Sequence, residues 1–337
     1  MQIKRINLAL QGGGAHGAYT WGVLDRLLEE ERIEVEAISG TSAGAMNAAV
    51  FADGMGRGGR AEARQALDVF WRNISRAAQY GPLQPTPFDR LGSGWNLDHS
   101  AAFVAFDMLT RMLSPYQFNP MNYNPLRRVL EESVDFDRLE GCRAVKLFIS
   151  STNVRTGKVR VFKSGEITPE VLLASACLPF LFQAVTIDGD PYWDGGYMGN
   201  PAIFPLIYGA QSPDVVIVQV NPLGCDRVPT TAPEIMNRLN EISFNSSLMR
   251  EMRAISFVTD LIDQGKLDSN HYKRVNVHWI EAEKQMRGLG VSSKLNARMD
   301  FLLHLKEIGR QVADGWIASH FDAIGHRSTV DIQEKFL

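Results

Sequence analysis

Residues 6–17 read INLALQGGGAHG, a short run of mainly apolar residues followed directly by a glycine-rich segment. Such a run, bounded by glycine, is typical of a buried strand that ends in a tight turn. Residues 18–31 continue with Val23, Leu24 and Leu27 at the spacing of one helix face. The sequence therefore predicts a strand, a glycine turn and a helix at the start of the chain.

The same order of elements follows at once in residues 33–50. The apolar residues at 33–38 predict a second strand. Residues 40–44 (GTSAG) predict a second turn of small residues, and the alanine-rich residues 45–50 predict a helix. Two strand–helix units in succession favour a parallel sheet joined by helical crossovers. The predicted fold class is accordingly α/β.

The composition of the 337 residues is that of an ordinary globular protein, with 45% hydrophobic and 22% charged residues. A formal net charge of -3, without a basic tail, argues against a nucleic-acid partner. Cys142, Cys177 and Cys225 are too few and too scattered for a disulfide framework or a zinc site. We expect neither a metal nor a cofactor.

No apolar stretch approaches the roughly 20 residues that would cross a bilayer. The apolar run at residues 6–10 is also too short for the core of a signal peptide. We therefore expect a cytoplasmic protein, and peripheral contact with a lipid surface is left open.

We expect residues 1–337 to form one elaborated domain, with a motif-bearing core at about 6–205 that residues 206–337 complete. A loop is expected at 52–64. Prolines recur through residues 80–124, and this pattern predicts an irregular insertion. The insertion serves either as a cover over the sheet edge or as a lid facing the substrate. Further strands are predicted at 145–151, 158–162, 215–220 and 275–280, and helices at 61–74, 169–177, 234–264 and 295–320.

Ser42 stands at the centre of a Gly40-x-Ser42-x-Gly44 pattern between a predicted strand and a predicted helix. In this context the pattern is typical of a nucleophile elbow, a sharp turn that lifts a serine above the sheet. A simpler interpretation is that Ser42 only caps the helix that follows it. A position at the start of a helix suits both interpretations.

The glycine loop comprises Gly12, Gly13, Gly14, His16 and Gly17, and it also fits the G-x-G-x-x-G pattern of dinucleotide-binding proteins. That function requires an acidic residue at the end of the second strand, which here runs into the GTSAG turn instead. Main-chain N–H groups at the start of a helix form an anion-binding surface. We therefore favour a role for this loop in binding the oxyanion of an acyl intermediate.

Asp194 is the clearest acidic candidate to activate Ser42. It lies in a Trp-Asp-Gly-Gly turn, where Gly195 and Gly196 let the backbone bend sharply. Taken alone, an Asp-Gly pair more often marks only a turn. The seven histidines offer no obvious base, since they lie in the glycine loop, in the insertion or in segments without turn signals: His16, His99, His271, His278, His304, His320 and His326.

The glycine loop, the Gly-x-Ser-x-Gly turn and the Asp-Gly-Gly turn occur in an order that resembles the patatin-like phospholipase family. The spacing of the first two motifs is similar to that family as well. Residues 125–128 (PLRR) and residues 174–179 (ASACLP) resemble two further family motifs. The resemblance runs from about residue 6 to residue 205.

This resemblance implies a three-layer α/β/α fold with a mostly parallel central sheet, and a Ser-Asp dyad acting on acyl esters, typically of lipids. Carried over by position, Ser42 is the nucleophile, Asp194 is the general base, and the N–H groups of Gly12, Gly13 and Gly14 bind the oxyanion. The implied activity is of the phospholipase A, lysophospholipase or carboxylesterase type. The remaining motif residues support these groups: His16, Gly17, Gly40, Gly44, Gly195 and Gly196.

Other functions remain open. A polyester depolymerase or an acyltransferase would use the same site, and a nucleotide-binding protein or a non-catalytic module would not use Ser42 at all. The chain also departs from the family at His16, where similar proteins commonly have Arg or Lys. Since the charge of a histidine changes near neutral pH, we expect the activity to be more pH-dependent if that basic position balances developing charge.

Overall fold

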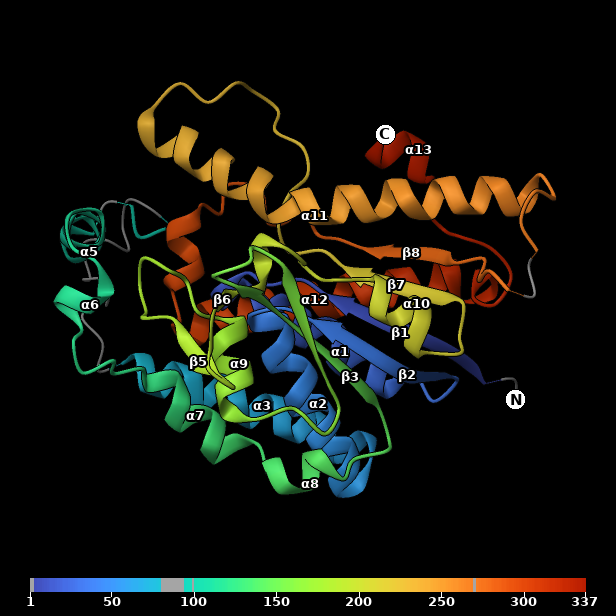
Figure 1. The fold of residues 1–337 in the computed structure, drawn as a ribbon, viewed down its shortest axis with the longest axis horizontal. Helices are drawn as coiled ribbons and strands as arrows, with labels where there is room; N and C mark the ends of the chain where they lie inside the picture. The colour runs from blue at the N-terminus through green and yellow to red at the C-terminus, as the bar shows by residue number, and fades with distance from the viewer. Residues whose placement is uncertain (1–2, 80–93, 99, 269–270) are drawn as a thin grey trace.

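A single eight-stranded sheet runs through the computed structural model, which describes residues 3–79, 94–98, 100–268 and 271–337 (Figure 1). The strand order is β5-β6-β3-β2-β1-β7-β8, and β4 pairs with β3. The strands are β1 (Lys4–Leu10), β2 (Ile33–Gly40), β3 (Lys146–Asn153), β4 (Val159–Lys163), β5 (Val185–Ile187), β6 (Asp190–Asp194), β7 (Asp214–Val218) and β8 (Asn276–Ile280).

The centre of the sheet is parallel and one side is antiparallel. β1 pairs in parallel with β2 and β7, β2 with β3, and β7 with β8. β3 pairs in antiparallel fashion with β4 and β6, and β5 with β6. The mostly parallel α/β sheet predicted from the sequence is therefore confirmed.

Helices connect the parallel strands and cover the sheet. They are α1 (Gly17–Glu29), α2 (Ala43–Gly58), α3 (Arg60–Ala78), α5 (Ala101–Met112), α6 (Pro115–Phe118), α7 (Pro125–Ser133), α8 (Phe136–Glu140), α9 (Pro169–Ser175), α10 (Phe204–Gly209), α11 (Ala232–Asp263), α12 (Met299–His320) and α13 (Ile332–Phe336). Short 3-10 turns lie at 14–16, 195–197, 291–295 and 321–323.

Both faces of the sheet are buried against helices. Successive side chains of a strand point to opposite faces, so each central strand contributes to both cores. On β1, Leu8 and Leu10 pack into a core with α1, α2 and α12, whereas Ala9 belongs to a second core. That second core contains Leu248 and Met252 of α11. Figure 1 shows α11 lying across its face of the sheet, so the molecule has the three layers expected.

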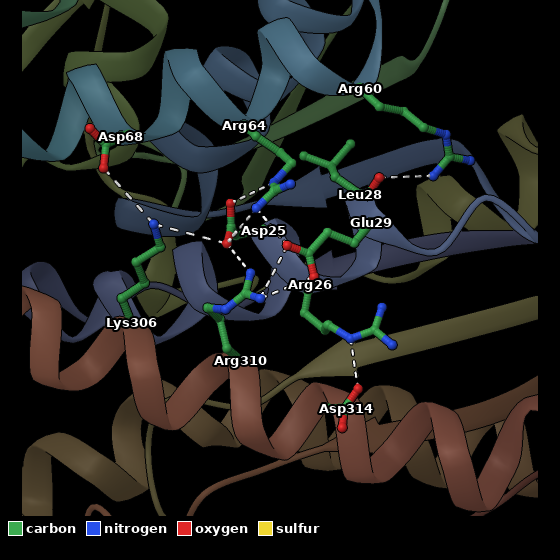
Figure 2. Close-up of polar contacts among 10 residues, drawn as sticks. All are labelled: Asp25, Arg26, Leu28, Glu29, Arg60, Arg64, Asp68, Lys306, Arg310 and Asp314. Carbon is green, nitrogen blue, oxygen red and sulfur yellow. Dashed lines mark hydrogen bonds and ion pairs between the residues drawn. The ribbon is translucent and has the colours of Figure 1, made fainter.

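Charged side chains join α1, α3 and α12 at the surface of the first core (Figure 2). Asp25 of α1 is 4% exposed and accepts a hydrogen bond of 2.9 Å from Arg64 Nε of α3. It also pairs with Arg310 of α12, and Lys306 Nζ lies 3.9 Å from its Oδ2. One buried carboxylate therefore connects three helices.

The prediction of a loop at residues 52–64 is wrong. α2 continues to Gly58, and α3 begins at Arg60 after a turn at Gly59 with φ of 80°. A Cβ atom on Gly54 would lie 2.4 Å from the Cα of Ala63, so this glycine permits close helix packing. The glycine-rich composition thus reflects contact between two helices.

The irregular insertion expected at residues 80–124 is helical in part. α5 and α6 lie within it, and Figure 1 shows them at the edge of the molecule. Residues 80–93 and 99 lie outside the described residues. Within the described ranges, no helix has the length and apolar character needed to cross a bilayer.

Candidate active site

Ser42 occupies a sharp turn between the end of β2 and the start of α2. Its backbone adopts φ of 54° and ψ of -121°, a region that residues with a side chain rarely occupy. A Cβ atom on Gly44 would lie 2.2 Å from the carbonyl oxygen of Leu10, so only glycine fits beside the neighbouring strand. Strand, strained serine and close-packed helix together form the elbow geometry predicted for this motif.

Ser175, at the end of α9, holds the backbone of the elbow by a hydrogen bond. The backbone N–H of Ser42 donates a hydrogen bond of 2.9 Å to Ser175 Oγ, which in turn donates one of 2.7 Å to the carbonyl oxygen of Ser150. Ser175 is fully buried. It belongs to the ASACLP motif, but no local sequence pattern indicates that it holds the elbow.

Asp194 ends β6 and lies beside the elbow. Its Oδ1 accepts a hydrogen bond of 2.7 Å from the N–H of Gly196. A Cβ atom on Gly195 would lie 2.2 Å from the carbonyl oxygen of Ser150, and one on Gly196 would lie 2.3 Å from the Phe244 ring. The two glycines therefore let the turn fit between β3 and α11.

The Asp194 carboxyl group is 1% exposed, and its environment favours the protonated form. Burial raises its pKa to about 7, although the Gly196 hydrogen bond, the Ser42 hydroxyl and the charge of Lys294 act to lower the pKa. Ser42 is close enough to influence the carboxyl group, but Oδ2 is buried without a hydrogen bond of ordinary geometry to any described residue. The carboxyl group thus lies near the Ser42 hydroxyl, and one of its two oxygens accepts no hydrogen bond of ordinary geometry from the described residues.

The glycine loop lies on the other side of Ser42. The N–H of Gly12 donates a hydrogen bond of 2.7 Å to Asn200 Oδ1, so it is not free to bind an oxyanion. The N–H groups of Gly13 and Gly14 donate to no other residue in the described part of the chain. Of the three donors expected, Gly13 and Gly14 are available, and both line the same cavity as Ser42.

His16 is buried behind the glycine loop, and Gly17 starts α1 beside it. The His16 Nε2 atom lies 2.7 Å from Ser293 Oγ. Burial, together with the charge of Lys294, lowers the pKa of His16 to about 3. The ring is therefore neutral near pH 7, and the pH dependence that we expected from its titration does not follow.

A cavity of about 640 Å³ opens above Ser42, Asp194, Gly13 and Gly14. Most of its other lining residues are apolar. Those from α3, α5, the segment after α9 and α11 include Phe70, Trp71, Ile74, Phe103, Phe106, Leu178, Phe180, Leu181, Phe182, Met236 and Phe244. The candidate nucleophile and base thus share an apolar cavity.

No histidine among the described residues lines this cavity. His278 is buried in β8, where its Nε2 lies 2.9 Å from Asp214 Oδ1, and the exposed His271 contacts Asp268. His99 lies outside the described residues. Within the described ranges, no group of three or more His, Cys, Asp or Glu is placed to hold a metal ion.

The sequence model of one known family, the patatin-like phospholipases, matches residues 8–207, which is more than half of the chain. The chain belongs to the patatin-like phospholipase family. The matched residues include the glycine loop, Ser42 and Asp194. A patatin-like fold therefore carries the elbow, the buried carboxyl group and the two free amides described above.

The curated relatives of this patatin-like chain include two fungal lysophospholipases. NTE1 of Cryptococcus neoformans is 27% identical over 219 residues, and the corresponding protein of Aspergillus terreus is 25% identical over 197 residues. These alignments cover 64% and 58% of this chain but only 11% of each relative. The chain therefore corresponds to a small part of these relatives.

Two solved structures are also similar to this patatin-like chain. VipD from Legionella pneumophila is 16% identical and has a TM-score of 0.40, with 93% of this chain and 67% of VipD covered. The type III effector ExoU of Pseudomonas aeruginosa is 16% identical and has a TM-score of 0.35, with 93% of this chain and 53% of ExoU covered. The family assignment rests on the match to residues 8–207.

Proposed function

We propose that the protein is a carboxylic ester hydrolase that acts on lipid acyl esters, with Ser42 as nucleophile and Asp194 as general base. One observation supports this above the others. A serine in a strained elbow and a buried carboxyl group, far apart in the sequence, line one cavity together with two free main-chain amides. Membership of the patatin-like phospholipase family is consistent with this activity.

The reaction proceeds in two steps. As Ser42 Oγ attacks the ester carbonyl carbon, Asp194 accepts the hydroxyl proton, and the N–H groups of Gly13 and Gly14 bind the oxyanion. The tetrahedral intermediate collapses, the alcohol takes the proton from Asp194 and leaves, and an acyl-Ser42 ester remains. Water then attacks this ester with Asp194 again as base, which releases the fatty acid and restores the Ser42 hydroxyl.

The shape and chemistry of the cavity favour a lipid acyl chain. Aromatic and aliphatic side chains line most of it, which suits a chain that gains free energy by leaving water. Phe180 and Met236 line the cavity and are also 68% and 48% exposed, so they lie at its opening. Met108 and Met112 of α5 are exposed as well. We infer that this apolar rim contacts a lipid surface.

The hydrolysis of p-nitrophenyl esters of short and long acyl chains tests the dyad. Ser42→Ala removes the nucleophile and Asp194→Asn removes the base, so we expect each to lower turnover by at least about 10³-fold. Ser319→Ala and Asp188→Asn change exposed residues of the same types and serve as matched controls. Substantial turnover in folded Ser42→Ala protein would defeat the proposal.

The acceptor of the acyl group separates the related functions. Release of free fatty acid from phospholipid or lysophospholipid vesicles supports the lipid hydrolase. Preferential transfer to an added alcohol or thiol would indicate an acyltransferase. Release of hydroxy acids from a polyester, without lipid hydrolysis, would indicate a depolymerase at the same site.

A further inference from the structure

Lys294 brings a charged group to the candidate site from the C-terminal part of the chain, outside the residues that match the family. It lies in the 3-10 turn at 291–295 and lines the same cavity as Ser42 and Asp194. Its Nζ donates a hydrogen bond of 2.7 Å to Asn221 Oδ1 and lies 5.9 Å from the centre of the Phe244 ring. The ammonium group is thus held in a defined position.

The turn that carries Lys294 packs directly on the glycine loop. A Cβ atom on Gly14 would lie 2.5 Å from the carbonyl oxygen of Lys294, and His16 Nε2 lies 2.7 Å from the hydroxyl group of Ser293. Asn221 strengthens this connection, because its Nδ2 donates a hydrogen bond of 2.8 Å to the carbonyl oxygen of Gly12. The position of the ammonium group is therefore coupled to that of the glycine loop.

The glycine loop itself lacks a cation. Its one titratable side chain is that of His16, which is buried and neutral. The His16 ring contacts Ser293, the residue before Lys294. A lysine from a distant segment thus approaches the loop where the loop's own residue carries no charge.

The charges around Lys294 come from several elements. Asp194 of β6 and Glu241 of α11 favour its protonated form, whereas loss of hydration lowers its pKa to about 8. His16 is neutral. A second cavity also reaches Lys294, and its other charged lining residues include Glu281, Glu283, Arg287, Asp226 and Arg227. Near pH 7 the lysine is protonated, and its charge favours the ionised form of Asp194.

Two further titratable groups face Asp194. Burial raises the pKa of the Tyr197 hydroxyl and of the Cys177 thiol to about 12, and the charge of Asp194 acts in the same direction. Both groups are neutral between pH 5 and pH 9. Among the groups named here, Lys294 is therefore the one whose positive charge opposes the effect of burial on Asp194.

We propose that Lys294 is an electrostatic positioning residue, whose ammonium group is held in the cavity that Ser42 and Asp194 share and favours the ionised form of Asp194. This role rests on the proposed function, in which Asp194 must be ionised to accept the Ser42 proton. Lys294 acts through Asp194 and takes no part in bond breaking. Its effect on the rate is therefore confined to the pH range in which Asp194 titrates.

The test compares kcat/KM for a p-nitrophenyl ester between pH 5.5 and pH 9 in wild type, Lys294→Gln and Lys294→Arg. Glutamine can still donate to Asn221 but carries no charge, whereas arginine keeps the charge. An opposite charge nearby lowers a carboxyl pKa by about one unit or more. We expect Lys294→Gln to lose about tenfold in kcat/KM at pH 6 and to approach wild type at pH 9.

The arginine variant and two controls complete the experiment. Lys294→Arg should retain the wild-type profile to within about threefold. Lys284→Met changes an exposed lysine nearby and should have no effect. Lys294→Met is a second neutral variant if the glutamine variant does not fold, and its profile is expected to match that of the glutamine variant.

The outcomes separate this inference from the proposed function. If Ser42→Ala is inactive but Lys294→Gln equals wild type at pH 6, Lys294 has no such role. An equal loss at every pH, in the arginine variant as well, would indicate a purely structural effect and would overturn the inference. Wild-type turnover in Ser42→Ala would instead reject the function on which the inference rests.

Discussion

At the scale of single residues, Asp194 combines a buried carboxyl group with an oxygen that has no hydrogen-bond partner of ordinary geometry among the described residues. Such an arrangement is unfavourable for an ionised group in a folded protein. It suits a general base, because a base with a pKa near the working pH is partly ionised and still binds a proton strongly. The energetic cost of burying Asp194 is therefore consistent with a catalytic role.

We expect Asp194→Asn to be more stable than wild type at pH 8, although it lacks activity. The pKa of Asp194 is raised in the folded state, so the wild type loses stability as pH rises from the unfolded-state pKa through about 7. Removing the ionisable group should raise the free energy of unfolding by about 2 kcal/mol at pH 8, after allowance for imperfect packing of the amide.

Urea unfolding at pH 8 and pH 4 checks this expectation. The difference between the two proteins should shrink at pH 4, where the folded wild type is protonated at Asp194. Asp188→Asn, in the hairpin between β5 and β6, provides the control. A variant that is less stable than wild type at both pH values would contradict the argument.

Single residues also mark the limit of what the sequence reveals. The sequence predicts Ser42 and Asp194 as site residues because each lies in a glycine turn at a strand end, a local signal. Ser175, Asn200 and Lys294 have no comparable signal, since each contacts the site only through the tertiary fold. The use of the Gly12 N–H by Asn200 could not be predicted for the same reason.

At the scale of secondary structure, α1 is held between α3 and α12 by the ion pairs of Asp25 (Figure 2). Burial alone would raise the pKa of Asp25, but the hydrogen bond from Arg64 and the charges of Lys306, Arg64 and Arg310 outweigh this effect. The pKa therefore lies below its ordinary value. Because α1 starts at the end of the glycine loop, this cluster also fixes the scaffold behind the site.

Asp25→Asn should lower the free energy of unfolding by about 2 kcal/mol at pH 7, since three cations lose their shared carboxylate. The partial exposure of Arg64 and Arg310 limits the effect. A lowered folded-state pKa means that this stability is present above the unfolded-state pKa and is lost as pH falls through the folded value. The difference should therefore shrink between pH 7 and pH 3.

Urea unfolding of Asp25→Asn and Asp314→Asn measures this contribution. Asp314 pairs with Arg26 at a site where its side chain is 64% exposed, so its replacement should change stability little. Equal stability of Asp25→Asn and wild type at pH 7 would show that the cluster does not stabilise the fold.

Most strands and long helices were predictable because apolar residues run continuously through the buried strands, as in β1 and β7, or recur on one face of a helix, as in α1. The prediction from sequence was wrong where a glycine allows two helices to pack closely and does not form a turn. Gly54 lies inside α2, where it allows contact with α3, and the local sequence does not distinguish this use from a loop. The last long helix begins at Met299 and not at residue 295, because a 3-10 turn at 291–295 comes before it.

At the scale of the whole molecule, the site draws on two parts of the chain. The family match ends at residue 207, yet Asn221, Phe244 and Lys294 contact or line the site from beyond it. Their segments reach the site because β7 pairs with β1 and α11 crosses the sheet. The order of the strands therefore brings these residues to the glycine loop.

In the proposed mechanism, Ser42 is the nucleophile that Asp194 activates. The most direct measurement is intact-protein and peptide mass spectrometry after reaction with an alkyl fluorophosphonate. We predict one adduct on Ser42 in the wild type, none in Ser42→Ala, and at least about 10²-fold slower labelling in Asp194→Asn. An adduct on another residue, or a wild type that hydrolyses esters while Ser42 remains unlabelled, would show that Ser42 is not the nucleophile.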